Sequence, residues 1–426
     1  MVVVGGGSAG VAAAVCAARA GCTTLLVERS PSLGGNVTHA LVHSICGTFH
    51  IASGESPRLA NGGFALEFAR RLVAEGSAQG PLRMGRMDVL LQEPAGFARL
   101  CETLVAAEPL LELVRNDVIA SASVSEGRVH SLTLERCGRV VHGKAFVDAT
   151  GDATLAQVVG AGVERVSPER LQRPAYIFGI SGVDPDALED GRRLRLVGAL
   201  SRAIREKRLP QELAGAAVRP TCVEGQVRVS IDLAAQAECY DPLNELLLAQ
   251  LHREVEGMAL VFVRFLKETV PGFEKAQVSE WPARLGIRES GRMIGLYQMR
   301  DEDVLRGATF EDAVCVSAWP VEMRETASGP RLQYPEGGRS CEVPLRALRS
   351  RDFDNLLAAG RCISCTHTAH AALRVIGTCL ATGQAAGLAA AEFAGAGGEC
   401  GAESESWLRW ARGIRRATGM GTGEAW

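Results

Sequence analysis

The sequence predicts an α/β protein in which both ends of the chain build one domain, a parallel sheet with an antiparallel meander, and the middle builds a second, α+β domain. Three observations support this prediction. The chain opens with a valine strand, a glycine turn and an alanine-rich helix, similar pieces return near its C-terminal end, and 426 residues exceed what one ordinary core holds. We place the first domain at residues 1–165 and 344–395, the second at 166–343, and a helical tail at 396–426.

The composition points to a small-molecule partner. The formal net charge is -3 and like charges form no runs, so nothing attracts nucleic acid or a membrane surface. The thirteen cysteines follow no disulfide-scaffold spacing. Residues 1–20 are apolar, but they lack a basic flank and contain three consecutive glycines, which argues against a signal peptide or a membrane span. We therefore expect a soluble, cytoplasmic protein, alone or as a homo-oligomer, that binds neither nucleic acid nor membranes.

The first strand, residues 2–4, is followed by Gly5-Gly6-Gly7-Ser8-Ala9-Gly10, a G-x-G-x-x-G motif. Gly5 permits the tight turn, Gly7 lets the backbone approach a pyrophosphate, and Gly10 lets the following helix pack on the strand. The positive N-terminus of that helix then points at the phosphates. We predict a Rossmann-like dinucleotide site that uses Gly5, Gly7, Ser8, Ala9 and Gly10.

The second strand, residues 25–27, ends at Glu28. This spacing suits a carboxylate that accepts both ribose hydroxyls of the dinucleotide, and we assign Glu28 and its neighbour Arg29 to the cofactor. The alternative is a glycine-rich turn that binds nothing, which the complete strand, helix and strand context disfavours.

Residues Gly34-Gly35-Asn36-Val37-Thr38 follow closely. They resemble the second glycine pair of the two-dinucleotide-binding-domain flavoproteins, which in that superfamily runs past the FAD, whereas plain NAD dehydrogenases lack it. The resemblance assigns to FAD the residues Gly34, Gly35, Asn36 and Thr38.

Short β-rich runs alternate with turns from residue 111 to residue 148, which is the pattern of a small antiparallel meander. The segment ends in an apolar strand and Ala149-Thr150-Gly151, whose small residues allow a backbone to pass close to a ligand. A simple strand-to-loop turn also explains them. We assign to the cofactor Val118, Ala149, Thr150 and Gly151.

In the second domain we predict strands at residues 176–180 and 227–233, and a long helix opened by Asp241 as N-cap and Pro242 in its first turn. The apolar spacing in that helix indicates core packing rather than a cofactor site. We interpret this domain as the one that binds the substrate.

Near the C-terminal end, residues 355–360 form an apolar strand that closes on Gly360-Arg361, and residues 381–387 lie at or near the start of an alanine-rich helix. In the superfamily named above, the N-terminus of that helix faces the flavin C2 carbonyl, where its dipole stabilises reduced flavin. The resemblance adds to the FAD site Gly360, Arg361, Thr382, Gly383 and Gln384.

Together these segments resemble the family described as FAD-dependent oxidoreductases, some members of which carry the label xanthan lyase. The resemblance implies noncovalently bound FAD and hydride exchange at the flavin N5, and it implies no particular substrate. Two features depart from the family pattern: the first strand begins almost at Met1, so we expect the true start upstream, and Cys365 replaces a small residue. The resemblance rests on residues 4–10, 34–38, 147–152, 284–292, 360–365, 373–375 and 378–387.

Two arginines are candidates for substrate binding. Arg374 lies in the loop that should cross the reactive side of the flavin, and its planar guanidinium suits a bidentate grip on a carboxylate. A structural ion pair is the alternative. Arg288 lies with Glu289 and Arg292 at the domain junction, where a salt-bridge network is the alternative.

Histidines are candidates for the acid or base, because imidazole titrates near neutral pH. His367 and His370 should lie close to the flavin by the same argument, with a structural role as the alternative for each. The histidines after the second glycine pair compete for the role: His39, His43 and His50.

Cys362 and Cys365 form a Cys-x-x-Cys and are candidates for a redox disulfide, but no second G-x-G-x-x-G for NAD(P)H is visible. The histidines and cysteines lack zinc-ligand spacing, so we expect no metal. We predict an FAD-dependent dehydrogenase or reductase that exchanges hydride between the flavin N5 and a small, anionic organic substrate. The alternatives are an oxygen-using monooxygenase or oxidase, and a non-catalytic electron-transfer subunit.

Overall fold

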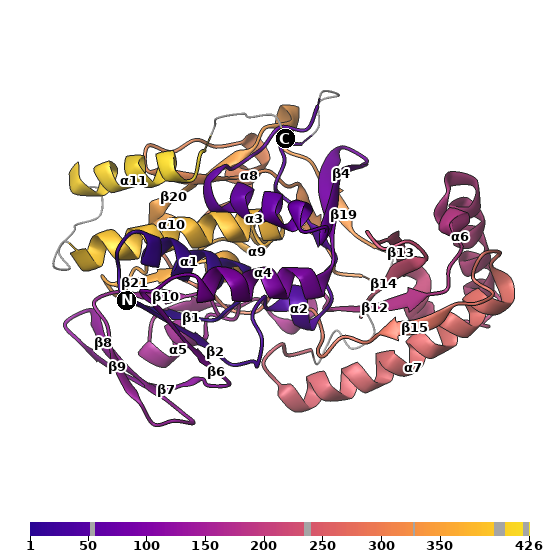
Figure 1. Ribbon diagram of the computed structural model, residues 1–426, viewed down its shortest axis with the longest axis horizontal. Helices are drawn as coiled ribbons and strands as arrows, with labels where there is room; N and C mark the ends of the chain where they lie inside the picture. The colour runs from indigo at the N-terminus through magenta and orange to yellow at the C-terminus, as the bar shows by residue number, and fades with distance from the viewer. Residues whose placement is uncertain (52–55, 234–239, 327–328, 396–404, 421–425) are drawn as a thin grey trace.

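The body of the protein is built on a parallel sheet that combines strands from distant parts of the chain (Figure 1). A computed structural model describes residues 1–51, 56–233, 240–326, 329–395, 405–420 and 426. The strand order is β21-β10-β1-β2-β6, and every neighbouring pair runs parallel. The predicted α/β class with a parallel sheet is therefore confirmed. The strands are β1 (Val2–Val4), β2 (Thr24–Glu28), β6 (Leu111–Arg115), β10 (Phe146–Asp148) and β21 (Leu356–Ala358).

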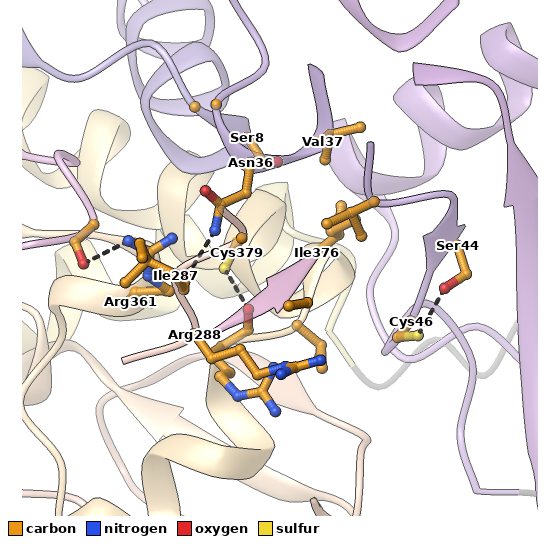
Figure 2. Close-up of a pocket in the computed structure, with 18 of the residues that line it drawn as sticks. Ser8, Asn36, Val37, Ser44, Cys46, Ile287, Arg288, Arg361, Ile376 and Cys379 are labelled. Carbon is orange, nitrogen blue, oxygen red and sulfur yellow. Dashed lines mark hydrogen bonds between the residues drawn. The ribbon is translucent and has the colours of Figure 1, made fainter. Parts of the chain in front are cut away.

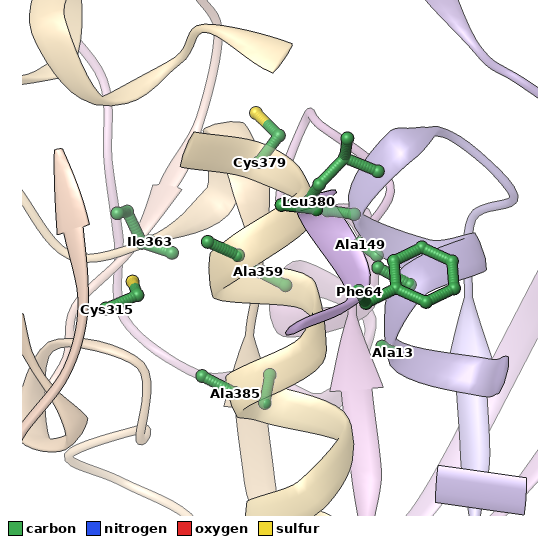
Figure 3. Packing of buried hydrophobic residues seen from close by; sticks show 14 of the residues in the cluster. Ala13, Phe64, Ala149, Cys315, Ala359, Ile363, Cys379, Leu380 and Ala385 are labelled. Atoms are coloured by element: carbon green, nitrogen blue, oxygen red, sulfur yellow. The ribbon is translucent and has the colours of Figure 1, made fainter. Parts of the chain in front are cut away.

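Two small-residue helices join the ends of the chain, α1 (Ser8–Arg19) and α10 (Ile376–Gly395). A Cβ added to Gly383 would lie 2.2 Å from the carbonyl oxygen of Ala9, and one added to Gly387 would lie 2.2 Å from that of Ala13. Because nothing larger than glycine fits there, the helix backbones can approach closely. Alanine side chains from both ends of the chain pack in the same cluster (Figure 3).

Further elements surround this sheet, including the predicted antiparallel meander, β7-β8-β9. The helices are α2 (Asn36–His39), α3 (Gly63–Ala74), α4 (Pro94–Ala106) and α5 (Thr154–Val159). The strands are β3 (Ser44–Ile45), β4 (Ala78–Met84), β5 (Met87–Gln92), β7 (Ile119–Ser125), β8 (Arg128–Leu134), β9 (Val140–His142) and β11 (Val163–Glu164).

The second domain projects from one side of the body in Figure 1 and contains a four-stranded antiparallel sheet, β13-β14-β12-β15. Its sides alternate as a pleated sheet requires: Val229 and Phe178 lie in a core with the long helix α7, whereas Arg219 and Ser230 line a cavity on the other side. The elements are β12 (Ala175–Ser181), β13 (Ala217–Pro220), β14 (Gln226–Asp232), β15 (Gln277–Glu280), α6 (Asp190–Arg205) and α7 (Glu245–Thr269).

The long helix begins later than the sequence predicted. Its N-cap is Asn244, whose side chain accepts a hydrogen bond from the Leu247 amide. Asp241 instead accepts from the Leu243 amide, in the turn that precedes the helix. Both polar residues suit an N-cap, and the one directly before the apolar run takes the position.

The chain returns to the body of the protein after Ile287, because buried residues between Met299 and Val343 pack with the first core. The packing thus changes well before the predicted boundary at residue 343. The returning elements are β16 (Arg292–Met293), α8 (Asp301–Arg306), β17 (Ala313–Ser317), β18 (Val321–Met323), β19 (Arg331–Gln333), β20 (Cys341–Pro344), α9 (His367–Leu373) and α11 (Glu405–Ala417).

The predicted helical tail contains α11, while residues 396–404 and 421–425 lie outside the described residues. Throughout the described ranges, every helix is too short or too polar to cross a bilayer.

Candidate functional site

A cavity of about 770 Å³ lies at the carboxyl ends of the parallel strands. Val4, Glu28, Ala149 and Ala359 all line it, and each stands at or directly after the end of a strand of the parallel sheet. Ligands of open α/β sheets bind at this edge, where the loops leave the sheet. The same cavity continues to the second-domain sheet, so one space joins the predicted cofactor site and the predicted substrate site.

The glycine turn leaves the first amides of α1 for a ligand. Gly5 has φ +100°, and an added Cβ would lie 2.5 Å from the Ala149 oxygen, so only glycine fits. A Cβ on Gly10 would lie 1.7 Å from the Gly5 oxygen, as expected where a helix packs onto its own turn. The N-cap of α1 is Gly7, no side chain caps the helix, and its first turn holds no acid. An anion can therefore take these positions.

Glu28 binds the glycine turn itself. One carboxylate oxygen accepts the Gly6 amide at 2.6 Å, and the other accepts the Ser30 amide at 2.8 Å. Each oxygen keeps a further lone pair, and the side chain lines the cavity. Glu28 thus shapes the turn in addition to its predicted role toward the ribose.

The second glycine pair lies against the first. The Gly34 amide donates to the Gly6 oxygen at 2.9 Å, and Gly34, Gly35 and Asn36 line the cavity. The Asn36 amide group donates to the Ile287 oxygen at 2.7 Å (Figure 2). Thr38 does not line the cavity, because its hydroxyl donates within the turn to the Leu33 oxygen.

Two more loops complete this side of the cavity. Its lining includes Val118, Ala149, Thr150, Gly151, Gly360 and Arg361. The Arg361 guanidinium donates to the Gly151 oxygen at 2.9 Å and pairs with Asp152 at 3.2 Å. These contacts tie the loop after β10 to the loop after β21.

Three residues of α10 that we assigned to FAD do not line the cavity. The helix begins at Ile376, so Thr382, Gly383 and Gln384 lie beyond its first turn and do not line the cavity. The Thr382 hydroxyl accepts the Gly360 amide, and Gln384 binds the backbone of Phe64 and Ala417. The end of α10 that lines the cavity is instead formed by Ile376 and Cys379.

Arg284 also lines the cavity. From the sequence it belongs to the segment that carries the family resemblance, and no role was predicted for it. Its buried Nε has no hydrogen-bond partner within the described residues, and it forms no ion pair there. Burial lowers the pKa of its guanidinium to about 10, and the neighbouring charges of Arg29 and Arg361 add to this. Glu28 and Asp152 oppose them only in part. The site therefore carries excess positive charge beside the glycine turn.

The substrate side of the cavity is lined by more arginines. Arg374 is half-buried, and its guanidinium donates at 3.2 Å to the side-chain oxygen of Gln172 and to the backbone oxygen of Glu322. Burial lowers its pKa to about 10. Within the described residues it has no ion pair, so the structural ion-pair alternative is not what the structure shows.

Arg288 lines the cavity, but both terminal nitrogens of its guanidinium are bound to other residues. It donates to the Arg173 oxygen at 2.6 Å and pairs with Asp232 at 2.8 Å. Arg324 pairs with the same aspartate at 2.7 Å and with Glu322 at 2.7 Å. This arrangement matches the salt-bridge alternative for Arg288 rather than a free substrate-binding group.

The two candidate histidines do not line the cavity. His367 lies behind it, with Nδ1 2.8 Å from a Glu289 oxygen that also accepts from Arg292 at 2.6 Å. His370 is buried, and burial holds its pKa well below the usual range. Burial raises the pKa of Glu289, but the bond from His367 and the charges nearby outweigh it and lower that pKa to about 2. These groups form a buried network next to Arg374.

Of the competing histidines, His43 lines the cavity. It is buried, and desolvation lowers its pKa to about 3, so it is neutral at ordinary pH. His39 binds the Ser32 oxygen and His50 lies by Ser340.

The cysteine pair has two separate environments. The Cys362 sulfur accepts the Gly151 amide at 3.0 Å and faces Asp148, whereas the Cys365 thiol donates to the Ile363 oxygen. Both are free, and burial raises both pKa values, to about 12 for Cys365. Thiolate chemistry is disfavoured at both positions. Within the part of the chain that the structure describes, no three metal-binding side chains cluster.

These features define an α/β protein with a cavity at the carboxyl ends of its parallel strands that suits a dinucleotide. Residues 1–398 match the FAD dependent oxidoreductase family, and the chain belongs to that family. No curated protein matches the sequence.

Solved flavoprotein structures resemble the fold at low identity. A geranylgeranyl bacteriochlorophyll reductase-like protein from Thermoplasma acidophilum is 14% identical with a TM-score of 0.47, covering 98% of this chain and 83% of that one. A probable FAD-dependent monooxygenase from Pseudomonas aeruginosa is 13% identical with a TM-score of 0.43, covering 98% and 91%. The p-nitrophenol 4-monooxygenase of Pseudomonas putida is 14% identical with a TM-score of 0.43, covering 100% and 86%.

The cofactor of this family is FAD, and the residues of the cavity fit it. The glycine turn and the open N-terminus of α1 suit a diphosphate, and Arg284 offers beside them a cation that forms no ion pair with the residues that the structure describes. When bound, FAD supplies two-electron chemistry at its N5 position.

Proposed function

We propose that the protein is an oxidoreductase that exchanges hydride between bound FAD and a small, anionic organic molecule, with Arg374 as the anchor of an acid group. One observation carries the proposal: Arg374 is a half-buried cation that lines the cavity and has no ion pair within the described residues. Burying an unpaired charge is costly, and an anionic ligand removes that cost.

The neighbours of Arg374 support an anchoring role. Gln172 and the backbone oxygen of Glu322 hold one guanidinium nitrogen, which orients the group without neutralising it. The other terminal nitrogen, Nη1, keeps its donors and can bind a carboxylate oxygen, which positions the acid group as well as attracting its charge. The start of α10, two residues further along, lies on the same cavity.

A positioning role follows for the residues beside Arg374. The network of Glu289, Arg292 and His367 holds helix α9, which leads to Arg374, so we assign these residues to positioning.

The cysteines support a reducing compartment. The eleven cysteines in the described residues are free thiols, which suits the cytoplasm, where we propose that the protein acts.

The test is anaerobic mixing of FAD-loaded protein with a panel of organic acids and their amides, followed by flavin absorbance. Bleaching by an acid, and not by its amide, supports the proposal. Reduced protein is then exposed to air or to an artificial electron acceptor. Turnover that requires oxygen and inserts it into the product would replace hydride exchange by monooxygenase chemistry.

A further inference from the structure

The cavity surface of the second-domain sheet carries one cation, Arg219, that forms no ion pair with any described residue. Three charged side chains lie on this side of β13 and β14: Arg219, Arg228 and Asp232. Arg228 pairs with Glu93 at 3.2 Å and with Glu280 at 2.6 Å. Asp232 pairs with two arginines. Arg219 lines the cavity, yet within the described residues it has neither an ion pair nor a side-chain hydrogen bond.

The charges around Arg219 increase this imbalance. Burial lowers the pKa of its guanidinium, and the nearby Arg193 and Arg324 lower it further. The opposing carboxylate is Glu322, which already binds Arg324 and the indole nitrogen of Trp319. An anion placed here would relieve the repulsion.

Arg219 and Arg374 line the same cavity, and each is half-buried. Arg374 feels the charge of Glu289, which is fully buried. Arg219 feels Arg193, which is exposed on α6. The charged neighbours therefore place Arg374 toward the protein interior and Arg219 toward the surface.

Apolar side chains line the same cavity as the two cations. The alternate residues Met87, Val89 and Leu91 of β5 line the cavity, together with Leu82 and Met84 of β4. Val89 packs in a small cluster with Trp319, Cys46 and Val375, and Val375 directly follows Arg374. Cys46 lies within electrostatic reach of both Arg374 and Arg219.

Parts of this apolar surface remain exposed. Leu82 is 39% exposed and Leu332 is 37% exposed, and both line the cavity. Large apolar side chains left open beside a cavity are typical of a ligand site.

We propose that the substrate is an organic diacid with an apolar centre. Arg374 binds one acid group inside the cavity, the β4 and β5 side chains pack on the centre, and Arg219 binds the second acid group at the mouth. This inference rests on the proposed function and extends it by naming the substrate class and a specificity-determining residue.

The experiment measures binding to FAD-loaded protein by calorimetry. The probes are linear dicarboxylates from glutarate to sebacate, with the monoamide and the diamide of each. The best dicarboxylate should bind roughly tenfold or more tightly than its monoamide, because a hydrogen-bonded charge pair contributes that much. Arg219→Gln should remove this preference while leaving monoamide binding and FAD content unchanged.

A matched control is Arg205→Gln, which removes an exposed arginine on α6 and should keep the preference. Arg219→Lys retains the charge and should keep part of the preference for the dicarboxylate. This second variant shows whether the glutamine variant loses the preference through the missing charge or through misfolding. Equal binding of dicarboxylate and monoamide to the wild-type protein overturns the inference. A preference that survives Arg219→Gln also overturns it.

Failure of the inference and failure of the proposed function remain distinguishable. If a neutral or singly charged compound reduces the flavin and dicarboxylates do not bind, the diacid assignment fails while hydride exchange stands. If dicarboxylates bind but no compound in the panel exchanges electrons with the flavin, the binding site stands and the redox proposal fails.

Discussion

The Glu28 carboxylate accepts a hydrogen bond from the backbone amide of Gly6 at 2.6 Å, so the acid at the end of β2 holds the glycine turn at the end of β1. This contact links two features of the dinucleotide site that are separate in the sequence. Glu28 therefore holds the turn in place, and we propose that it also binds the ribose of the cofactor.

Glu28→Ala should therefore weaken FAD binding by at least the value of a hydrogen bond to a charged group, about 1.5–3 kcal/mol. The measurement is the dissociation constant from quenching of flavin fluorescence. Glu135→Ala, an exposed change on the meander side, is the control. Unchanged affinity in the Glu28 variant would show that neither contact matters to the cofactor.

The glycine turn was predictable because its geometry is local. Gly5, Gly7 and Gly10 act through their own backbone, and the spacing to Glu28 follows from one strand, helix and strand unit. The start of α10 was harder, because the alanine-rich run around Thr382 looks like a helix start, whereas the helix begins at Ile376.

The substrate side was largely unpredictable because distant segments build it. Arg219 lies on a short strand that the sequence argument did not identify, and its cavity neighbours on β4 and β5 lie more than a hundred residues earlier. His367 and His370 are close to Arg374 in the sequence, but helix α9 directs them into the protein interior. Only the alternation of Val218 and Arg219 offered a local signal.

Arg284→Met should have opposite effects on cofactor affinity and on the stability of the cofactor-free protein. The side chain is half-buried, its Nε has no hydrogen-bond partner within the described residues, and burial lowers its pKa to about 10, so its charge destabilises the protein without FAD. Removing it should raise the melting temperature of the FAD-free protein and weaken FAD binding roughly tenfold or more. Thermal unfolding and FAD titration check the two effects, with Arg205→Met as the control. A variant that loses stability without FAD and keeps its FAD affinity contradicts this assignment.

Cys362→Ala should destabilise the fold by about 1–3 kcal/mol, because the Gly151 amide and the buried Asp148 lose a partner. Cys362→Ser keeps a donor and an acceptor and should lose less. Urea unfolding gives the values, and Cys137→Ala, at an exposed thiol, is the control. If Cys362 and Cys365 instead formed a redox disulfide, flavin reduction by a dithiol would depend on both thiols, and this structural role would be wrong.

Stability should fall in mild acid because of His370. Its folded pKa lies well below the unfolded value of about 6.5, so the unfolded chain binds the proton first as the pH drops. The stability that neutral His370 contributes is fully present above a pH of about 6.5. Below that pH the free energy of unfolding falls, by up to about 1.4 kcal/mol per pH unit. His370→Gln should reduce this slope in urea unfolding, whereas His142→Gln, on the exposed strand β9, should not. Equal slopes in the wild-type protein and the His370 variant would assign the acid sensitivity to other groups.

Arg374→Lys tests the anchor directly, because lysine keeps the charge but loses the planar fork. Misplacing the reacting carbon by about an ångström costs on the order of a hundredfold in rate, so turnover of an identified substrate should fall by about that factor. FAD content and the flavin spectrum should stay nearly unchanged, because the contacts of Arg374 are to Gln172 and Glu322 rather than to the glycine turn. If Arg374 only held its loop in place, replacing it would instead lower the FAD content or the stability of the protein. If the lysine variant binds FAD normally and turns over at the wild-type rate, Arg374 is not the anchor, and Arg219 becomes the residue on which substrate orientation depends.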